Sequence, residues 1–114
     1  QENLDGVKRG MRAVVNSIDG TAANVFRDFP FHVAGKTGTS ETGYEATSSS
    51  NGLFVCYAPY DDPQIAIAVV VEHGVWGSQT APIARDIMLE YFRLNEKNET
   101  KVLESEEGSI EIIW

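Results

Sequence analysis

The segment Gly35-Lys36-Thr37-Gly38-Thr39 holds the residues whose types and spacing best suit chemistry in this sequence. Two kinds of site use a lysine and threonines set among glycines in this way. One binds phosphate, and the other transfers an acyl group on a strand that lies beside a serine nucleophile. The two glycines are expected to clear side chains from one surface, so that another molecule can approach the backbone closely.

Phosphate binding is the weaker interpretation of this segment. A phosphate loop needs Gly-x-x-x-x-Gly-Lys-Thr between a strand and a helix, and Gly35-Lys36-Thr37 supplies only its end. Pro30 stands where the first glycine of that loop is required. The residues after Thr37 lead into a polar loop instead of a helix, so the helix N-terminus that cradles phosphate is missing. The segment therefore favours acyl transfer.

Three strands are predicted around this motif. The first spans residues 31–39 and ends in the motif, and a polar loop over residues 40–50 follows it. A second strand over residues 53–58 and a third over residues 64–72 form a hairpin across a proline-containing turn. Odd-numbered and even-numbered residues of the third strand are both apolar, which predicts that other elements cover both of its faces.

Helical periodicity flanks the strands. The first amphipathic helix is predicted over residues 4–16 with Asn3 as its cap, and a short second helix runs from a cap at Thr21 toward Phe26. The last helix spans residues 82–94, with proline in its first turn. Its predicted apolar stripe consists of Ile83, Ile87, Met88, Tyr91 and Phe92.

Composition bounds the class of protein. The 114 residues are 42% hydrophobic and 23% charged, which suits one globular domain. The net charge of -8 opposes contact with phosphate backbones, so nucleic acid is not an expected partner. The longest apolar run, Ile65–Val71, has seven residues, far fewer than the roughly 18 to 20 that span a bilayer. A chain that begins at Gln1 is expected to be a piece of a longer polypeptide.

Neither the histidines nor the cysteine suggests a metal centre or a cofactor. His32 and His73 have no second ligand at a suitable spacing, and no metal or cofactor is expected. Cys56 lies in an apolar stretch and is interpreted as a small core residue.

Residues 1–95 are taken as the folded unit and residues 96–114 as an acidic tail. The alternating Ile110, Ile112 and Trp114 at its end leave open that the tail docks as a short strand.

Several stretches together carry a family resemblance. They are VAGKTGTSE at residues 33–41, NGLFVCYAPYDDPQIAIAVVVEHG at 51–74, APIARDIMLEYF at 81–92 and GTA at 20–22. Over about residues 4 to 94 the chain resembles the C-terminal part of the penicillin-binding protein transpeptidase domain, of the class B monofunctional D,D-transpeptidases. The resemblance implies an α+β fold whose antiparallel sheet has three strands in this fragment and five in the complete domain, with helices on its faces.

The resemblance also assigns roles to the motif. Its strand is the exposed edge of the sheet, along which a D-Ala-D-Ala stem peptide or a β-lactam adds as a further strand. Lys36 supplies a positive charge near the serine hydroxyls and the substrate carboxylate, which the hydroxyls of Thr37 and Thr39 bind. The backbone N–H of Thr39 is one of two oxyanion-hole donors. Gly38 provides clearance for the substrate.

The nucleophile of this family is expected to lie outside the chain. Its Ser-x-x-Lys motif is absent, because no serine of the sequence has a lysine three positions later. Ser49-Ser50-Asn51 matches the Ser-x-Asn motif of the family, but in the wrong place, and is taken as accidental. The chain alone is therefore expected to be inactive, and to be held by the missing N-terminal part, self-associated or domain-swapped.

Two relatives of the same fold remain as alternatives: a β-lactam-sensing receptor domain and a β-lactamase. The Asp61-Asp62-Pro63 turn and the GTA segment favour the transpeptidases. By resemblance, the parent protein works on the extracytoplasmic face of the bacterial membrane, held by an anchor outside this chain. Whether Trp76 and Tyr44 contact the substrate is left open.

Overall fold

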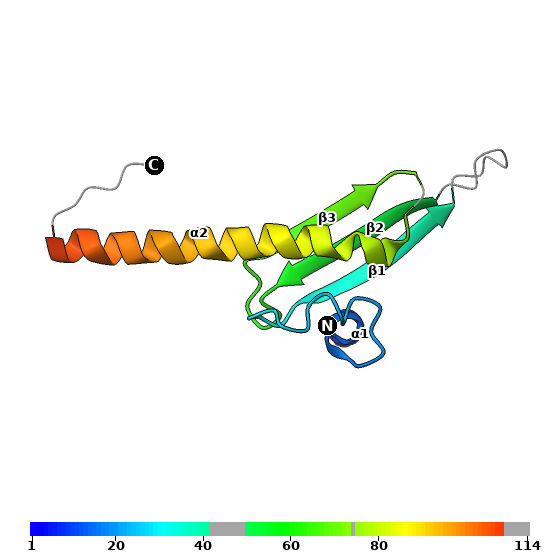
Figure 1. Cartoon of the computed structure of the whole chain (residues 1–114). Helices are drawn as coiled ribbons and strands as arrows, with labels where there is room; N and C mark the ends of the chain where they lie inside the picture. Colours follow the sequence, from blue (N-terminus) through cyan, green and yellow to red (C-terminus); the bar gives the residue numbers. More distant parts are fainter. Residues whose placement is uncertain (42–49, 74, 109–114) are drawn as a thin grey trace.

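The chain folds into one antiparallel sheet with helices around it (Figure 1). The computed structural model describes residues 1–41, 50–73 and 75–108, and for 101–108 it gives the course of the helix alone. Its elements are α1 (Glu2–Asn16), β1 (Ala34–Glu41), β2 (Ser50–Ala58), β3 (Ile65–Val71), the 3₁₀ turn η2 (Gly77–Gln79) and α2 (Ala81–Gly108). The expected α+β class with three antiparallel strands is confirmed.

The sheet has the order β1-β2-β3 with both pairs antiparallel, and β2 and β3 form the predicted hairpin. Its register aligns Thr37 with Phe54, and Phe54 with Val69. Side chains of a strand alternate between the two faces. Thr37 and Phe54 therefore share one face with Val69, which we call the helix face because α2 crosses it. Lys36 and its partners in the register point to the other face, which we call the bare face.

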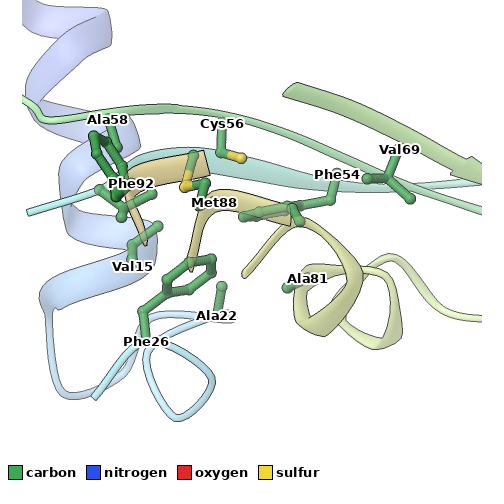
Figure 2. Packing of buried hydrophobic residues seen from close by; sticks show 12 residues of the cluster. Val15, Ala22, Phe26, Phe54, Cys56, Ala58, Val69, Ala81, Met88 and Phe92 are labelled. Carbon is green, nitrogen blue, oxygen red and sulfur yellow. The ribbon is translucent and has the colours of Figure 1, made fainter. Parts of the chain in front are cut away.

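The core lies between the helix face and α2 (Figure 2). Phe54 and Met88 are fully buried there, and each contributes about 1.5–3 kcal/mol of transfer free energy. The buried line on α2 differs from the predicted stripe, since Ile83 and Ile87 are 43% and 46% exposed. Met88 and Phe92 of the predicted stripe are buried as expected, and Ala81 and Ala84 are buried in addition. The small alanines let the start of α2 approach the sheet closely.

The prediction that both faces of β3 are covered is wrong for the described chain. Val69 is buried on the helix face, whereas Val70, on the bare face, is 60% exposed. The bare face carries an apolar hollow of about 360 Å³ next to α1. Its lining residues are Met11, Val55, Cys56, Tyr57, Ala66, Ile67 and Ala68. Among the described elements only α1 borders this face, through Met11, so the apolar character of β3 exceeds what the described residues bury.

The segment between α1 and β1 forms successive turns instead of the predicted short helix. The N–H of Ala22 donates to the carbonyl of Val14 at 3.1 Å, which ties the segment back to the end of α1. A Cβ on Gly20 would lie 2.2 Å from the same carbonyl oxygen, so only glycine fits there. Asn3 is not the cap of α1, because the helix begins at Glu2 with Gln1 as its N-cap.

The strands also differ from their predicted limits. Residues 31–33 lie outside β1 because their carbonyls have other partners: that of His32 accepts from the Tyr60 N–H at 2.8 Å. The carbonyl of Val33 accepts from the Asn16 amide at 2.8 Å. At its other end β1 continues to Glu41, and β2 begins already at Ser50, so the pairing takes in residues assigned to the polar loop.

Helix α2 is longer than predicted and projects beyond the sheet (Figure 1). It continues past Leu94 because the acidic segment contains good helix formers and no glycine before Gly108. An ion pair between Glu90 and Arg93 adds a local contact on its surface. The predicted docking of the apolar C-terminus concerns residues 109–114, which lie outside the described residues.

We expect the isolated 114-residue chain to self-associate. Its bare face exposes Val55 and Val70, α1 exposes Leu4 and Val7, and β3 has an unpaired edge among the described residues. Apolar surface beside an open strand edge promotes pairing between chains. Sedimentation velocity should show dimers or larger species that dissociate on dilution. A monomer that unfolds in one cooperative thermal transition would contradict this expectation.

Candidate active site

The lysine of the motif lies on the bare face near the free edge of the sheet. Lys36 aligns with Val55 of β2, and its side chain is exposed. Its ammonium group donates to the carbonyl of Thr37 at 2.8 Å. Among the described residues, no carboxylate forms an ion pair with it. Its charge is therefore available to an anion that approaches the edge of β1.

The two threonine hydroxyls of the motif lie on the opposite, helix face. The hydroxyl of Thr37 is 3.0 Å from that of Thr21, and either can be the donor. The hydroxyl of Thr39 accepts a hydrogen bond from the backbone N–H of Gly77 at 3.0 Å. The ammonium group and the hydroxyls thus flank the same strand from its two faces, so they can meet only in front of its free edge.

That edge is open because β1 pairs with β2 alone in the described sheet. The carbonyl of Thr37 accepts from Lys36, which indicates that it points away from β2. Residues two apart in an antiparallel strand direct their N–H and C=O groups to the same side. The N–H of Thr39 is therefore expected to face outward as well. This orientation suits both strand addition and the expected role as an oxyanion donor.

The two glycines of the motif do different work, and the expectation that both clear one surface is wrong. A Cβ on Gly35 would lie 2.7 Å from the ring of Phe54, so Gly35 makes room for the core on the helix face. A Cβ on Gly38 would meet only Leu53, at an ordinary 3.6 Å. No packing demand therefore explains a glycine at position 38. That Gly38 gives clearance for a ligand stays a prediction.

Sequence reasoning missed the two groups that hold the threonine hydroxyls. From the sequence, Thr21 is expected only as a helix cap and as part of the GTA segment, and Gly77 is assigned no role at the site. Both reach the motif through tertiary folding, across 16 and 38 positions of sequence. A glycine donates through its backbone, so residue type alone gave no signal for Gly77.

Other polar residues considered as site candidates form hydrogen bonds within the fold. Ser50 and Asn51 stand at the start of β2, where they bond the carbonyl of Val75 at 3.2 Å and the N–H of His73 at 3.2 Å. The second histidine, His32, accepts from Arg12 at 3.0 Å. Within the ranges that the structure describes, no three His, Cys, Asp or Glu side chains gather as metal ligands.

The thiol of Cys56 is not a nucleophile at neutral pH. It is 3% exposed on the helix face, and burial raises its pKa to about 12. A thiol in such a place stays protonated and behaves as a small apolar group, as expected.

Trp76 is 66% exposed just before η2, and Tyr44 lies outside the described residues. None of the described helices is long and apolar enough to cross a membrane.

Comparison with known proteins gives the family. The profile of the family described as the penicillin binding protein transpeptidase domain matches residues 1–89. The peptidoglycan D,D-transpeptidase MrdA of Haemophilus influenzae is 35% identical over 97 residues, which are 74% of this chain and 15% of that protein. The chain therefore spans about a seventh of the length of this relative.

Solved structures agree with this match. Penicillin-binding protein PBP2 of Pseudomonas aeruginosa, in complex with WCK 5153, is 38% identical with a TM-score of 0.70, over 79% of this chain and 20% of that chain. PBP2 of Helicobacter pylori, in complex with MreC, is 31% identical with a TM-score of 0.72, over 82% and 18%. With its three strands in the same arrangement and its Lys-Thr-Gly-Thr segment on the free edge, the chain belongs to the penicillin-binding protein transpeptidase domain family.

Proposed function

We propose that this chain forms the substrate-binding edge of a peptidoglycan D,D-transpeptidase. The observation that carries the proposal is the placement of the Lys36-Thr37-Gly38-Thr39 motif on a strand whose outer edge is free. An extended stem peptide ending in D-Ala-D-Ala, or a β-lactam, can bond to such an edge as an added strand. The name of the Haemophilus influenzae relative supports the same activity.

The motif residues divide the work of binding and catalysis. Lys36 attracts the substrate carboxylate and places a positive charge near the nucleophile, and the hydroxyls of Thr37 and Thr39 donate to the same carboxylate. The outward N–H of Thr39 stabilises the negative charge that develops on the carbonyl oxygen. Gly38 leaves the backbone accessible. The roles of Lys36 and Thr39 are thus catalytic, whereas Thr37 and Gly38 serve binding.

The reaction itself is acyl transfer through a serine ester. A serine attacks the carbonyl of the penultimate D-Ala, the terminal D-Ala leaves with the proton of the hydroxyl, and an amine of a second stem peptide then displaces the serine. A β-lactam acylates the serine in the same way, but its opened ring remains attached. Because the sequence has no Ser-x-x-Lys, that serine must lie in another part of the protein, and this chain alone is inactive.

The setting of the activity follows from its substrate. Peptidoglycan lies outside the cytoplasmic membrane, so the complete protein is proposed to act on the extracytoplasmic face, held there by an anchor outside these residues. The other part of the transpeptidase domain is the partner that covers the bare face. The exposed Val55 and Val70 on that face fit such a cover.

Intact mass spectrometry of the complete polypeptide, with and without benzylpenicillin, tests the proposal. We expect one stable adduct per molecule, and peptide mapping should place it on a serine outside the 114 residues. Benzylpenicillin whose ring has been opened beforehand serves as the control and should give no adduct. An adduct within this chain, or none at all, would overturn the proposal. Rapid loss of the adduct would identify a β-lactamase, and a stable adduct without cross-linking of stem peptides would identify a receptor.

Replacing the motif lysine should slow acylation specifically. We expect Lys36→Ala in the complete protein to lower the rate of acylation by benzylpenicillin at least about tenfold, on the scale of lost electrostatic stabilisation. Lys97→Ala removes the same charge from the exposed surface of α2 and should leave the rate unchanged. Stopped-flow or gel-based acylation kinetics measure both variants. Equal rates for Lys36→Ala and the parent would remove Lys36 from the site.

The two glycines should separate stability from activity. Gly35→Ala is expected to destabilise the fold by about 1–3 kcal/mol, because its Cβ overlaps the ring of Phe54. Gly38→Ala has room and should change stability by no more than about 0.5 kcal/mol, but it should slow acylation by obstructing the edge of β1. Urea unfolding and acylation kinetics of the complete protein give the two readouts. Normal acylation of Gly38→Ala would disprove the clearance role.

A further inference from the structure

The turn η2 lies directly on the motif strand. The N–H of Gly77 donates to the hydroxyl of Thr39 at 3.0 Å, on the helix face of β1. A Cβ on Gly77 would lie 2.2 Å from the carbonyl oxygen of Gly38 and 2.7 Å from its nitrogen. Gly77 is buried, and its φ lies outside the left-handed region, so the close approach is what requires glycine. The backbone of Gly38 and Thr39 thus rests against this one residue.

A second glycine contact fixes η2 on the neighbouring strand. A Cβ on Gly52 of β2 would lie 2.9 Å from the Trp76 carbonyl oxygen and 2.9 Å from the Cγ2 methyl of Thr80. Gly52 and Thr39 are partners in the register, so both contacts fall at the same level of the sheet. Together they hold the turn against β1 and β2 at two points.

Internal hydrogen bonds make η2 itself a fixed structure. The hydroxyl of Thr80, 1% exposed, donates to the carbonyl of Gly77 at 2.6 Å. The side chain of Gln79 accepts from the N–H of Trp76 at 2.7 Å. Helix α2 begins immediately afterwards at Ala81, which is buried in the core. The turn is therefore anchored to the core on one side and to the motif on the other.

The bond from Gly77 decides what the Thr39 hydroxyl can do. A hydroxyl has one hydrogen to donate and lone pairs to accept with. The Gly77 N–H occupies the acceptor side and leaves the hydrogen free to point toward an anion. Thr37 differs, because its partner is the hydroxyl of Thr21, and either of these two hydroxyls can donate. A backbone N–H can donate but not accept, so Gly77 forces the Thr39 hydroxyl to donate elsewhere. The Thr37 hydroxyl has no such constraint.

We propose that η2 is a positioning element of the site, in which Gly77 orients the Thr39 hydroxyl as a donor to the substrate carboxylate and sets the position of the Gly38–Thr39 backbone. This inference rests on the proposed function, because the carboxylate belongs to the stem peptide or β-lactam. Gly77 touches neither the substrate nor the reacting atoms. Its effect reaches them through Thr39.

The test compares two ligands that differ only in the carboxylate. The complete protein and its Gly77→Ala variant are acylated with benzylpenicillin and with its methyl ester, and rate constants are measured. We expect Gly77→Ala to lower the rate with benzylpenicillin by about tenfold or more, as for loss of a hydrogen bond to a charged group. The rate with the ester, which lacks the anion, should fall by a smaller factor. Ser78→Ala, an exposed neighbour in the same turn, is the control and should match the parent.

A pair of substitutions at Thr80 guards against a variant that fails to fold. Thr80→Ser keeps the hydroxyl that bonds the Gly77 carbonyl, and Thr80→Val keeps the methyl group that packs on Gly52. If this hydrogen bond positions η2, Thr80→Val should lower the ratio of the benzylpenicillin rate to the ester rate. Thr80→Ser should keep that ratio at the value of the parent. Both variants are compared at equal folded fraction, taken from the amount of protein that is acylated at completion.

The outcomes separate this inference from the function on which it rests. Acylation of the parent with a ligand-dependent loss in Gly77→Ala and Thr80→Val supports the positioning role. Acylation of the parent with equal losses for both ligands, or with no loss, overturns the positioning role and leaves the proposed function standing. A parent that is not acylated at all overturns both.

Discussion

The structure depends on the pairing of β1 with only one neighbour. Pairing with β2 fixes the register of the motif, while the absence of a second described partner leaves the outer N–H and C=O groups of β1 available. An unpaired edge is a hazard in most sheets, because it invites aggregation. In the proposed function the hazard is also the means of recognition, since an extended ligand would satisfy the same groups. Several described contacts support that strand: Phe54 packs in the core on the helix face, Gly77 of η2 bonds Thr39, and Thr21 lies beside Thr37.

Much of the architecture could be predicted from local patterns. Helical periodicity located α1 and the start of α2, and the apolar run at residues 65–71 located β3 within a residue at each end. Predictions failed where a tertiary contact overrode local preference. Ala22 bonds to the end of α1 in place of starting a helix, and Val33 gives its carbonyl to Asn16 in place of a strand partner. Neither partner lies close in sequence, so no local pattern could have indicated them.

The candidate site shows the same division. The identity and order of its motif residues could be read directly, and the resemblance supplied their expected roles. What could not be read is which face each residue occupies and what lies behind it. Gly35 and Gly38 look equivalent in sequence, yet one makes room for a phenylalanine ring and the other faces open space. Gly77 is invisible in a different way, because its contribution comes from an amide that every residue except proline possesses.

The position of Lys36 on the bare face links the chemistry to the completion of the fold. The ammonium group emerges beside Val55, on the surface whose apolar side chains remain uncovered by the described residues. Any segment that docks there excludes water from the valines and at the same time borders the lysine. In a drier setting the attraction between an ammonium group and an anion grows stronger. If Lys36 acts as proposed, a half-assembled domain would hold its lysine in bulk solvent, where the attraction is weak, and the site would reach full strength only when a further segment covers the bare face.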